Sequence, residues 1–204
     1  AIIWVEKAYV ENRFAAKGYV FINALEQQLN SARVALKSLE ALFYVHGGDG
    51  LSQEEFNFFT RQQKANNKTL DVLGYFDIQK GQSQLKVTHV HPAGHSVFKP
   101  GRLFKKPSEN TLALEDLAEL PATTQSVSRQ LWQQTYLTMY RGDALLTVLN
   151  TQIEETPKLM ALMSPLYHER HNSFSRQAFN VPALDDFMHK NVSGFPWMVL
   201  KPAS

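Results

Sequence analysis

Cysteine is absent from the 204 residues of this chain. Its absence excludes disulfide bonds, thiol nucleophiles and cysteine-ligated metal sites. An excess of charge is also lacking, because the formal net charge at pH 7 is only +2. A protein that binds a phosphate backbone carries a dense basic stripe, and the nearest stretch, "KPGRLFKK" (Lys99–Lys106), is interpreted as a solvated loop. We therefore expect no nucleic-acid partner.

Long apolar runs are missing as well. No stretch reaches the roughly eighteen apolar residues of a membrane-spanning helix, and none resembles a signal peptide. The chain opens on "AIIWV" (Ala1–Val5) without an initiator Met and closes on "FPWMVLKPAS" (Phe195–Ser204), with Trp4 and Trp197 near the ends. From these ends we expect a piece excised from a longer protein.

Catalytic motifs are lacking too, including glycine-rich phosphate loops, GxSxG and HExxH. Two histidines lie three residues apart in "HERH" (His168–His171), where solvated imidazoles are favoured over metal ligands. Asp71 and Asp77 would lie about 20 Å apart on an extended strand, too far for an acid/base pair. We expect no enzymatic activity, no metal and no cofactor in this chain.

The most regular feature that is present is an apolar repeat with steps of three and four residues, which is a heptad seam. Its members are Ile22, Leu25, Leu29, Ala32, Leu36, Leu39 and Phe43. The repeat predicts a helix from about Tyr9 to His46, roughly 55 Å long at 1.5 Å per residue. Two interpretations stay open. The helix packs along its own domain, or it pairs with a second copy through Ile22, Leu25, Leu29, Leu36 and Leu39.

The rest of the chain reads as short helices and strands. Ser52 and Glu55 form a capping-box pattern ahead of a predicted helix at Gln53–Gln63. Further helices are predicted at Ser108–Leu120 and Val181–Asn191, and strands at Leu70–Ile78, Ser83–Ala93, Thr124–Arg129, Ala144–Leu149, Leu159–Tyr167, Ser173–Asn180 and Phe195–Leu200. The first two strands are expected to pair across Gln79–Gln82. This order predicts an α+β fold with a mainly antiparallel sheet.

Two aromatic or imidazole pairs are candidates for a ligand pocket. Strict alternation places His89 and His91 on the apolar face of their strand with Leu85 and Val87. Trp132 and Tyr136 lie four residues apart, so a short helix would stack them on one side. For both pairs, packing in a core and lining a pocket remain alternative interpretations.

Three consecutive segments resemble the start of a CHASE domain: "LKSLEALFYV" (Leu36–Val45), "LSQEEFNFFTRQ" (Leu51–Gln62) and "TLDVLGYFDI" (Thr69–Ile78). CHASE domains are extracytoplasmic sensor modules of receptor histidine kinases, diguanylate cyclases and related bacterial enzymes, and of plant cytokinin receptors. The likeness continues in "KVTHVHPA", "ATTQSVSR" and "LMALMSPLY" and spans most of Leu36–Val199. It departs at "GHSVFKPGRLFKKPSEN" (Gly94–Asn110), where many bacterial members carry G-x-D.

The resemblance implies a long stalk and dimerisation helix at 1–46, followed at 47–200 by PAS-like antiparallel sheet modules. It implies a homodimer whose flanking transmembrane helices lie outside this chain. It also implies a periplasmic or extracellular location, as part of an inner-membrane receptor of the histidine kinase or diguanylate cyclase/phosphodiesterase type. An unknown small molecule would bind among Tyr75, His89, His91, Met163 and Tyr167, with Trp132 and Tyr136 as a lid.

Met163 stands where cytokinin-binding members carry a threonine, so cytokinin is not the expected ligand. Two other functions remain as alternatives. One is a periplasmic protein-interaction module without a small-molecule ligand, which a filled sheet interior would favour. The other is a metal-dependent hydrolase that uses His89, His91 and His168.

Overall fold

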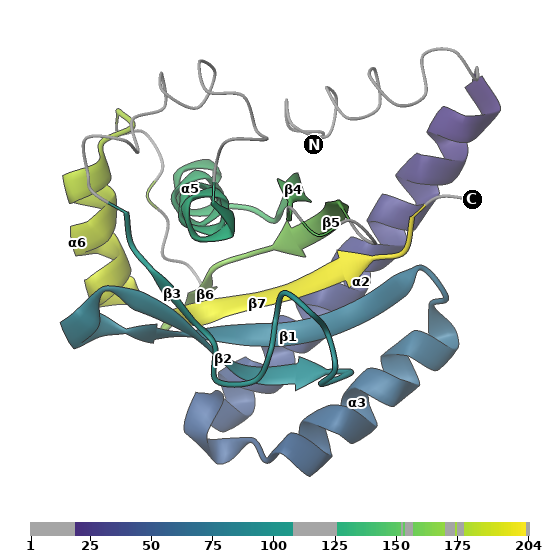
Figure 1. The fold of residues 1–204 in the computed structure, drawn as a ribbon, viewed down its shortest axis with the longest axis horizontal. Coiled ribbons are helices and arrows are strands. Elements are labelled where there is room, and N and C mark those ends of the chain that lie inside the picture. The colour runs from purple at the N-terminus through teal and green to yellow at the C-terminus, as the bar shows by residue number, and fades with distance from the viewer. Residues whose placement is uncertain are drawn as a thin grey trace.

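The chain was analysed as a computed structural model, which describes residues 19–107, 126–151, 153, 157–169, 174 and 178–202, with side chains from residue 26 onward except that of Lys80. A curled antiparallel sheet forms the middle layer. Helices α2 (Tyr19–Gly50) and α3 (Gln53–Asn66) cover one face, and α5 (Val127–Arg141) and α6 (Val181–Asn191) lie on the other side (Figure 1). The predicted α+β class, with a long N-terminal helix ahead of a PAS-like antiparallel sheet, is confirmed.

Helix α2 follows from the apolar repeat, and its seam packs against the sheet of the same chain. The buried members of the seam share one core with sheet residues: Leu29, Ala32, Leu36, Leu39 and Phe43. Helical geometry breaks at Gly47, whose φ of 70° and ψ of 167° suit glycine. The regular part of the helix therefore ends at His46, as predicted, and α2 continues past this break to Gly50.

Helix α3 begins where the capping pattern predicts. The Ser52 side chain accepts a hydrogen bond from the Glu55 backbone N–H at 3.1 Å, which satisfies one of the free donors of the first helical turn. Phe56 faces inward and is fully buried. The helix thereby lies over β1 (Leu70–Gln79) and β2 (Gln84–His91), next to α2.

The remaining strands complete the sheet: β3 (Leu103–Lys105), β4 (Leu145–Asn150), β5 (Lys158–Met163), β6 (Leu166–Tyr167) and β7 (Val192–Leu200). Within the described residues the order is β3-β2-β1-β7-β5-β4, and β6 pairs with β7. Strands β1 and β2 form the predicted hairpin, through a 3-10 turn at Lys80–Gln82. The chain then crosses to the far edge through α5 and returns through α6 to the central strand β7, which is a PAS-like arrangement.

The sheet separates two apolar cores, and close glycine contacts tie its central strands together. On the α5 side, a Cβ atom on Gly74 would lie 2.2 Å from Cζ2 of Trp197. On the α2 side, a Cβ on Gly194 would lie 2.2 Å from the hydroxyl oxygen of Tyr75. Each aromatic ring therefore occupies space that only a glycine on the neighbouring strand leaves open.

Some predicted elements need correction. The strand predicted at Thr124–Arg129 is wrong, because α5 begins at Val127 and Ser126 caps it by accepting from the Arg129 N–H at 3.2 Å. No strand forms at the described residues of the stretch Ser173–Asn180, which are Phe174 and residues 178–180. The helix predicted at Ser108–Leu120 lies outside the described residues. Helix α6 has the predicted bounds, with Pro182 in its first turn.

Candidate functional site

Helix α5 lies across the curled sheet and makes hydrogen bonds to both of its edge strands. The Trp132 indole N–H donates to the backbone oxygen of Phe104 on β3 at 2.9 Å. At the other edge, the Gln130 side-chain amide accepts from the Asn150 N–H and donates to the Asn150 oxygen on β4, each at 2.9 Å. These bonds satisfy backbone groups that an edge strand would otherwise leave unpaired. The same bonds hold α5 in place over the sheet, between β3 and β4.

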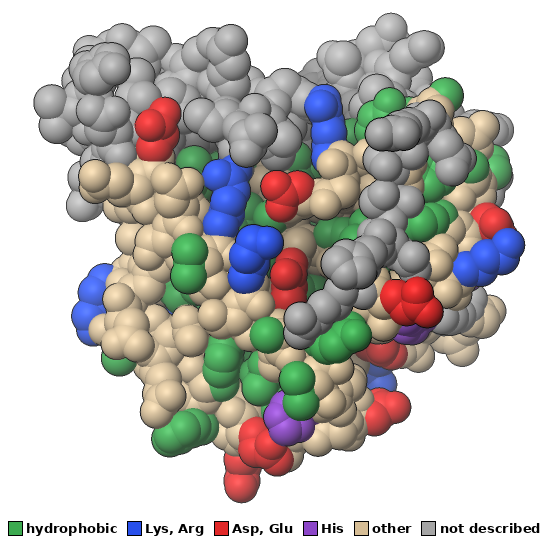
Figure 2. Space-filling view, turned by 180° about the vertical axis from the view of Figure 1, so that it is seen from behind, with side chains coloured by type: hydrophobic (Ala, Val, Ile, Leu, Met, Phe, Trp, Pro, Cys, Tyr) green, Lys and Arg blue, Asp and Glu red, His purple; other side chains and the backbone are tan. Residues whose placement is uncertain are grey.

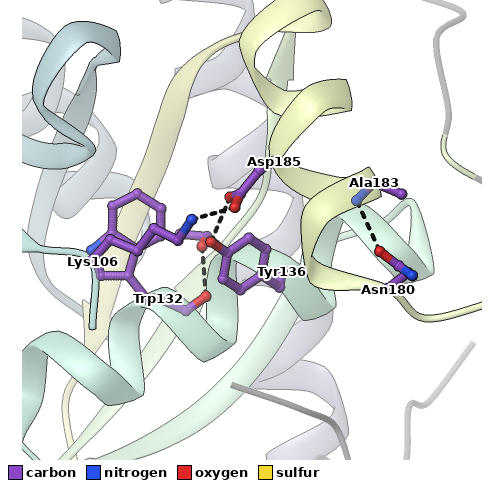
Figure 3. Close-up of polar contacts among 7 residues, drawn as sticks. Lys106, Trp132, Tyr136, Asn180, Ala183 and Asp185 are labelled. Atoms are coloured by element: carbon purple, nitrogen blue, oxygen red, sulfur yellow. Dashed lines mark hydrogen bonds and ion pairs between the residues drawn. The ribbon is translucent and has the colours of Figure 1, made fainter. Parts of the chain in front are cut away.

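A charged cluster joins α5 to α6 and to the residue that follows β3 (Figure 3). Lys106 forms an ion pair with Asp185, and the Tyr136 hydroxyl donates to the other carboxylate oxygen of Asp185 at 2.6 Å. The side chains of Lys106 and Asp185 are each only 14% exposed. We call Lys106, Trp132, Tyr136 and Asp185 the α5 charge cluster. The cluster thus combines a cation (Lys106), an anion (Asp185) and two aromatic side chains (Trp132 and Tyr136), one of which carries a hydroxyl group.

Local structure explains how Asp185 reaches this cluster. Asn180 caps α6 by accepting from the Ala183 N–H at 3.0 Å (Figure 3). This cap fixes the first turn, so that Leu184 enters the core and Asp185 faces α5. Its neighbour Asp186 instead forms an exposed ion pair with Lys190 at 3.0 Å. Adjacent carboxylates on one helix therefore have opposite surroundings, which provides an internal control for any experiment on Asp185.

The residues expected to build one pocket are divided between the two faces of the sheet. Trp132, Tyr136, Met163 and Tyr167 lie on the α5 side. The ring centroids of Trp132 and Tyr136 are 5.9 Å apart, as the spacing of four predicted. Met163 is fully buried, so it belongs to the core. Tyr167 packs edge-on against Phe187, with ring centroids 5.9 Å apart.

The Tyr167 hydroxyl is buried and has no hydrogen-bond partner in the part of the chain that the structure describes. Burial, followed by the charge of Glu40, raises the pKa of Tyr167 to about 12. The phenol is therefore neutral at physiological pH and offers a donor.

Tyr75, His89 and His91 belong to the opposite side. Tyr75 stacks on Phe43 of α2 with ring centroids 4.0 Å apart. Nε2 of His89 lies 2.8 Å from the Leu51 oxygen, and Nδ1 lies 2.9 Å from the Thr88 hydroxyl. Both nitrogens of His89 therefore have partners inside a core. The expected wall that would join these residues to Met163 and Tyr167 does not form.

A β-bulge explains this error. Phe76 pairs with Val87, but Tyr75 pairs with His89, so that Thr88 is the extra residue of β2. Because a bulge inserts one residue into the alternation, the side chains after it change faces. Val87 accordingly lies in the α5-side core, whereas His89 packs with the residues of α2 and α3.

The apolar seam of α2, which the sequence suggested for dimerisation, faces the sheet of its own chain. Leu29, Leu36 and Leu39 are buried in the chain's own core, at most 3% exposed. The interpretation that the helix packs along its own domain therefore holds for this segment, and these three residues cannot be the dimer contact. The side chains of Ile22 and Leu25 lie outside the described residues.

The outer side of α2 and α3 carries an exposed apolar surface instead. Val34, Val45 and Phe58 are 67%, 74% and 58% exposed. Phe58 also lines a shallow groove of about 480 Å³, together with Leu42, Glu54, Glu55, Phe59 and Gln62. Figure 2 shows hydrophobic side chains over the lower part of this face, where α2 and α3 lie. Large exposed apolar side chains of this kind often mark contact surfaces.

Sequence reasoning missed Lys106 and Asp185. Lys106 was assigned to a solvated basic loop, and no short-range pattern links it to a carboxylate 79 residues further along the chain.

Among the described residues, no group of three or more His, Asp or Glu side chains could hold a metal ion. His168 lies next to Ser193, with 2.8 Å between Nδ1 and the hydroxyl oxygen. None of the helices in the described ranges is long and apolar enough to cross a membrane.

Comparisons with known proteins do not assign the chain to a family. No protein-family model matches the sequence, and no curated protein matches it.

Proposed function

We propose that this chain is the ligand-sensing domain of a transmembrane signalling receptor, located outside the cytoplasm and without enzymatic activity of its own. The proposal is carried by the α5 charge cluster. Lys106 and Asp185 are largely withdrawn from water and neutralise each other. A small molecule that carries an anionic and a cationic group would separate this ion pair. Its anionic group would then pair with Lys106 and its cationic group with Asp185. Tyr136 and Trp132 would supply a hydroxyl and an aromatic contact.

The mechanism is a shift between two populated arrangements of the domain. Exchange of the Lys106–Asp185 pair would alter how α6 and the end of β3 pack on α5. Helix α2, which lies on the other face of the sheet and contacts β7 and β5, would then change its packing and pass the signal along its length. The sequence resemblance to CHASE domains and the PAS-like strand order support this proposal, although a fold alone does not specify a function.

The direct test is a thermal-shift screen with small organic acids, amines and zwitterions. A ligand at 100 times its dissociation constant stabilises the folded state by about 2.7 kcal/mol, which raises the melting temperature of a domain of this size by roughly 5–10 °C. We expect that shift in the wild-type protein and in Asp186→Asn and Lys190→Met, and its loss in Asp185→Asn and Lys106→Met. Equal responses of the Asp185 and Asp186 variants would reject the α5 charge cluster as the site.

We further propose that the domain forms a homodimer through the outer side of α2 and α3. Val34, Val45 and Phe58 would lie in this contact. Because the chain contains no cysteine, single cysteines report contacts cleanly. Val34→Cys and Val45→Cys should cross-link in the membrane-bound receptor, whereas Leu36→Cys, which faces the sheet, should not. Cross-linking of all three to the same extent would contradict this interface.

A protein-interaction module is the second candidate, because the residues expected to wall a cavity are packed. Trp132 and Met163 are both fully buried. In this case the α2–α3 groove would bind a partner protein, and no small molecule would raise the melting temperature. Phe58→Ser would then abolish partner binding without changing the response to any compound.

A further inference from the structure

The α2–α3 groove combines an apolar floor with an acidic end. Leu42 and Phe59 pack on the core beneath α2 and form the floor, and the exposed ring of Phe58 stands beside them. Glu54 and Glu55 line the same groove from the first turn of α3, and both are exposed. Neither carboxylate forms an ion pair with a described residue. The groove therefore fits an apolar side chain that has positive charge beside it.

A surface of that kind lies at the edge strand β3. Leu103 is 46% exposed, and Lys105, two residues further along the strand, is also exposed. Phe104 between them is fully buried in the α5-side core, so that alternation turns Leu103 and Lys105 to the opposite side of the sheet. The exposed Lys99 is joined to this strand by a turn, in which the Arg102 N–H donates to the Lys99 oxygen at 3.1 Å. We call Lys99, Leu103 and Lys105 the β3 basic edge.

Charge decides which of these surfaces can meet. Two grooves placed face to face would bring four carboxylates together, and two β3 basic edges would bring four lysines together, so that both like pairings are repulsive. Only a groove against a basic edge joins opposite charges and buries apolar side chains on both partners. Helix α3 covers the side of the sheet that Leu103 and Lys105 face. Both surfaces therefore lie on one side of the molecule, where a single two-fold axis gives a closed dimer with two equal contacts.

We propose that the α2–α3 groove of one copy binds the β3 basic edge of a second copy, with Leu103 on the apolar floor and the two lysines against the two carboxylates. The apolar contact supplies affinity, and the charge pairs select the partner surface and its register. This inference rests on the homodimer proposed above, because it names the surface that the second copy brings to the outer side of α2 and α3.

The test uses single cysteines in a chain that has none of its own. Gln62→Cys marks the groove and Pro100→Cys marks the turn before β3; both positions are exposed, and neither change removes a charge. The two variants, carrying different tags, are mixed and treated with a short thiol-reactive cross-linker. The product that joins one variant to the other should exceed the statistical expectation severalfold, and high salt should reduce it.

A mixed product at the statistical level, or a predominance of products that join two Gln62→Cys copies, would overturn this contact. The homodimer would still stand if Val34→Cys and Val45→Cys cross-link as expected, and it would be rejected as well if they do not. The failure of this inference is therefore distinguishable from the failure of the proposal on which it rests.

Charge reversal identifies the pairs. Lys105→Glu in the Pro100→Cys variant should lower the mixed product by roughly two- to fivefold, the range of an exposed charge contact, and Glu54→Lys in the Gln62→Cys variant should restore it. Lys158→Glu reverses an exposed lysine at the start of β5 and should leave the product unchanged. Equal losses in the Lys105 and Lys158 variants, or no recovery with Glu54→Lys, would show that only net charge matters and would refute the contact.

Discussion

Asp185→Asn should destabilise the domain far more than Asp186→Asn, although the two carboxylates are neighbours on α6. Removal of the charge of Asp185 breaks its ion pair with the Lys106 ammonium, whose side chain is only 14% exposed. A fully buried pair costs about 3–5 kcal/mol when one partner is removed. The residual exposure reduces the loss here, and Asn can still accept from Tyr136, so we expect about 2 kcal/mol.

The exposed pair sets the scale for comparison. Asp186 and Lys190 are 67% and 69% exposed and lie one helical turn apart, so that removing this pair should cost at most about 0.5 kcal/mol. In calorimetry at pH 7, the 2 kcal/mol loss at Asp185 corresponds to a melting temperature lower by roughly 4–8 °C. The double variant Lys106→Met/Asp185→Asn should recover part of this loss, because it removes both charges of the buried pair.

Two outcomes would refute this reasoning. Equal melting temperatures for Asp185→Asn and Asp186→Asn would mean that water solvates Lys106 as freely as Lys190. A double variant no more stable than Asp185→Asn would mean that the loss does not come from the charge that remains on Lys106. In either case the cluster would not be the desolvated site on which the proposed ligand exchange depends.

Two further predictions concern the α2 side of the sheet. Gly194→Ala should lower the free energy of unfolding by about 1–3 kcal/mol in urea titrations, the typical cost of overpacking, because the new Cβ would meet the Tyr75 hydroxyl oxygen at 2.2 Å. Gly81→Ala, which meets nothing within 4 Å, should stay within about 0.5 kcal/mol of the wild type. Equal losses in the two variants would contradict the packing argument. Burial raises the pKa of Glu40, which accepts a hydrogen bond from Ser164, so that the folded state favours the protonated carboxyl. Its contribution to stability is present below the ordinary value of 4.5 and is lost as pH rises through the raised pKa. Glu40→Gln should therefore be more stable than the wild type at pH 8, by a margin that shrinks toward pH 4, and a margin independent of pH would refute the assignment.

Local signals in the sequence were sufficient to predict several elements. The seam of α2, the Ser52 cap of α3 and the bounds of α6 all follow from residues within one or two helical turns of one another. The hairpin of β1 and β2 likewise follows from adjacent segments. Such features are predictable because the residues whose interactions fix them lie close together in the sequence.

The candidate site depends on contacts between residues that lie far apart in the sequence. The alternation of β2 predicts the wrong face for Val87 relative to His89, because a bulge at Thr88 is set by the pairing with β1. A strand was predicted at Thr124–Arg129, but Ser126 caps a helix that is buried along most of its length. The pairing of Lys106 with Asp185 requires β3, α5 and α6 to come together, and no single segment carries that information.

The central strand β7 links the two faces of the molecule. Trp197 packs in the α5-side core, where its ring lies 5.1 Å from that of Phe76, whereas the next residue, Met198, is fully buried in the core beneath α2. Packed cores respond to displacement as units, because their side chains are close to crystal density. A rearrangement at the α5 charge cluster that moves Trp197 must therefore also move Met198 and the α2 residues packed with it. If the domain is a sensor, the sheet itself is the element through which the proposed ligand site and the long helix are coupled.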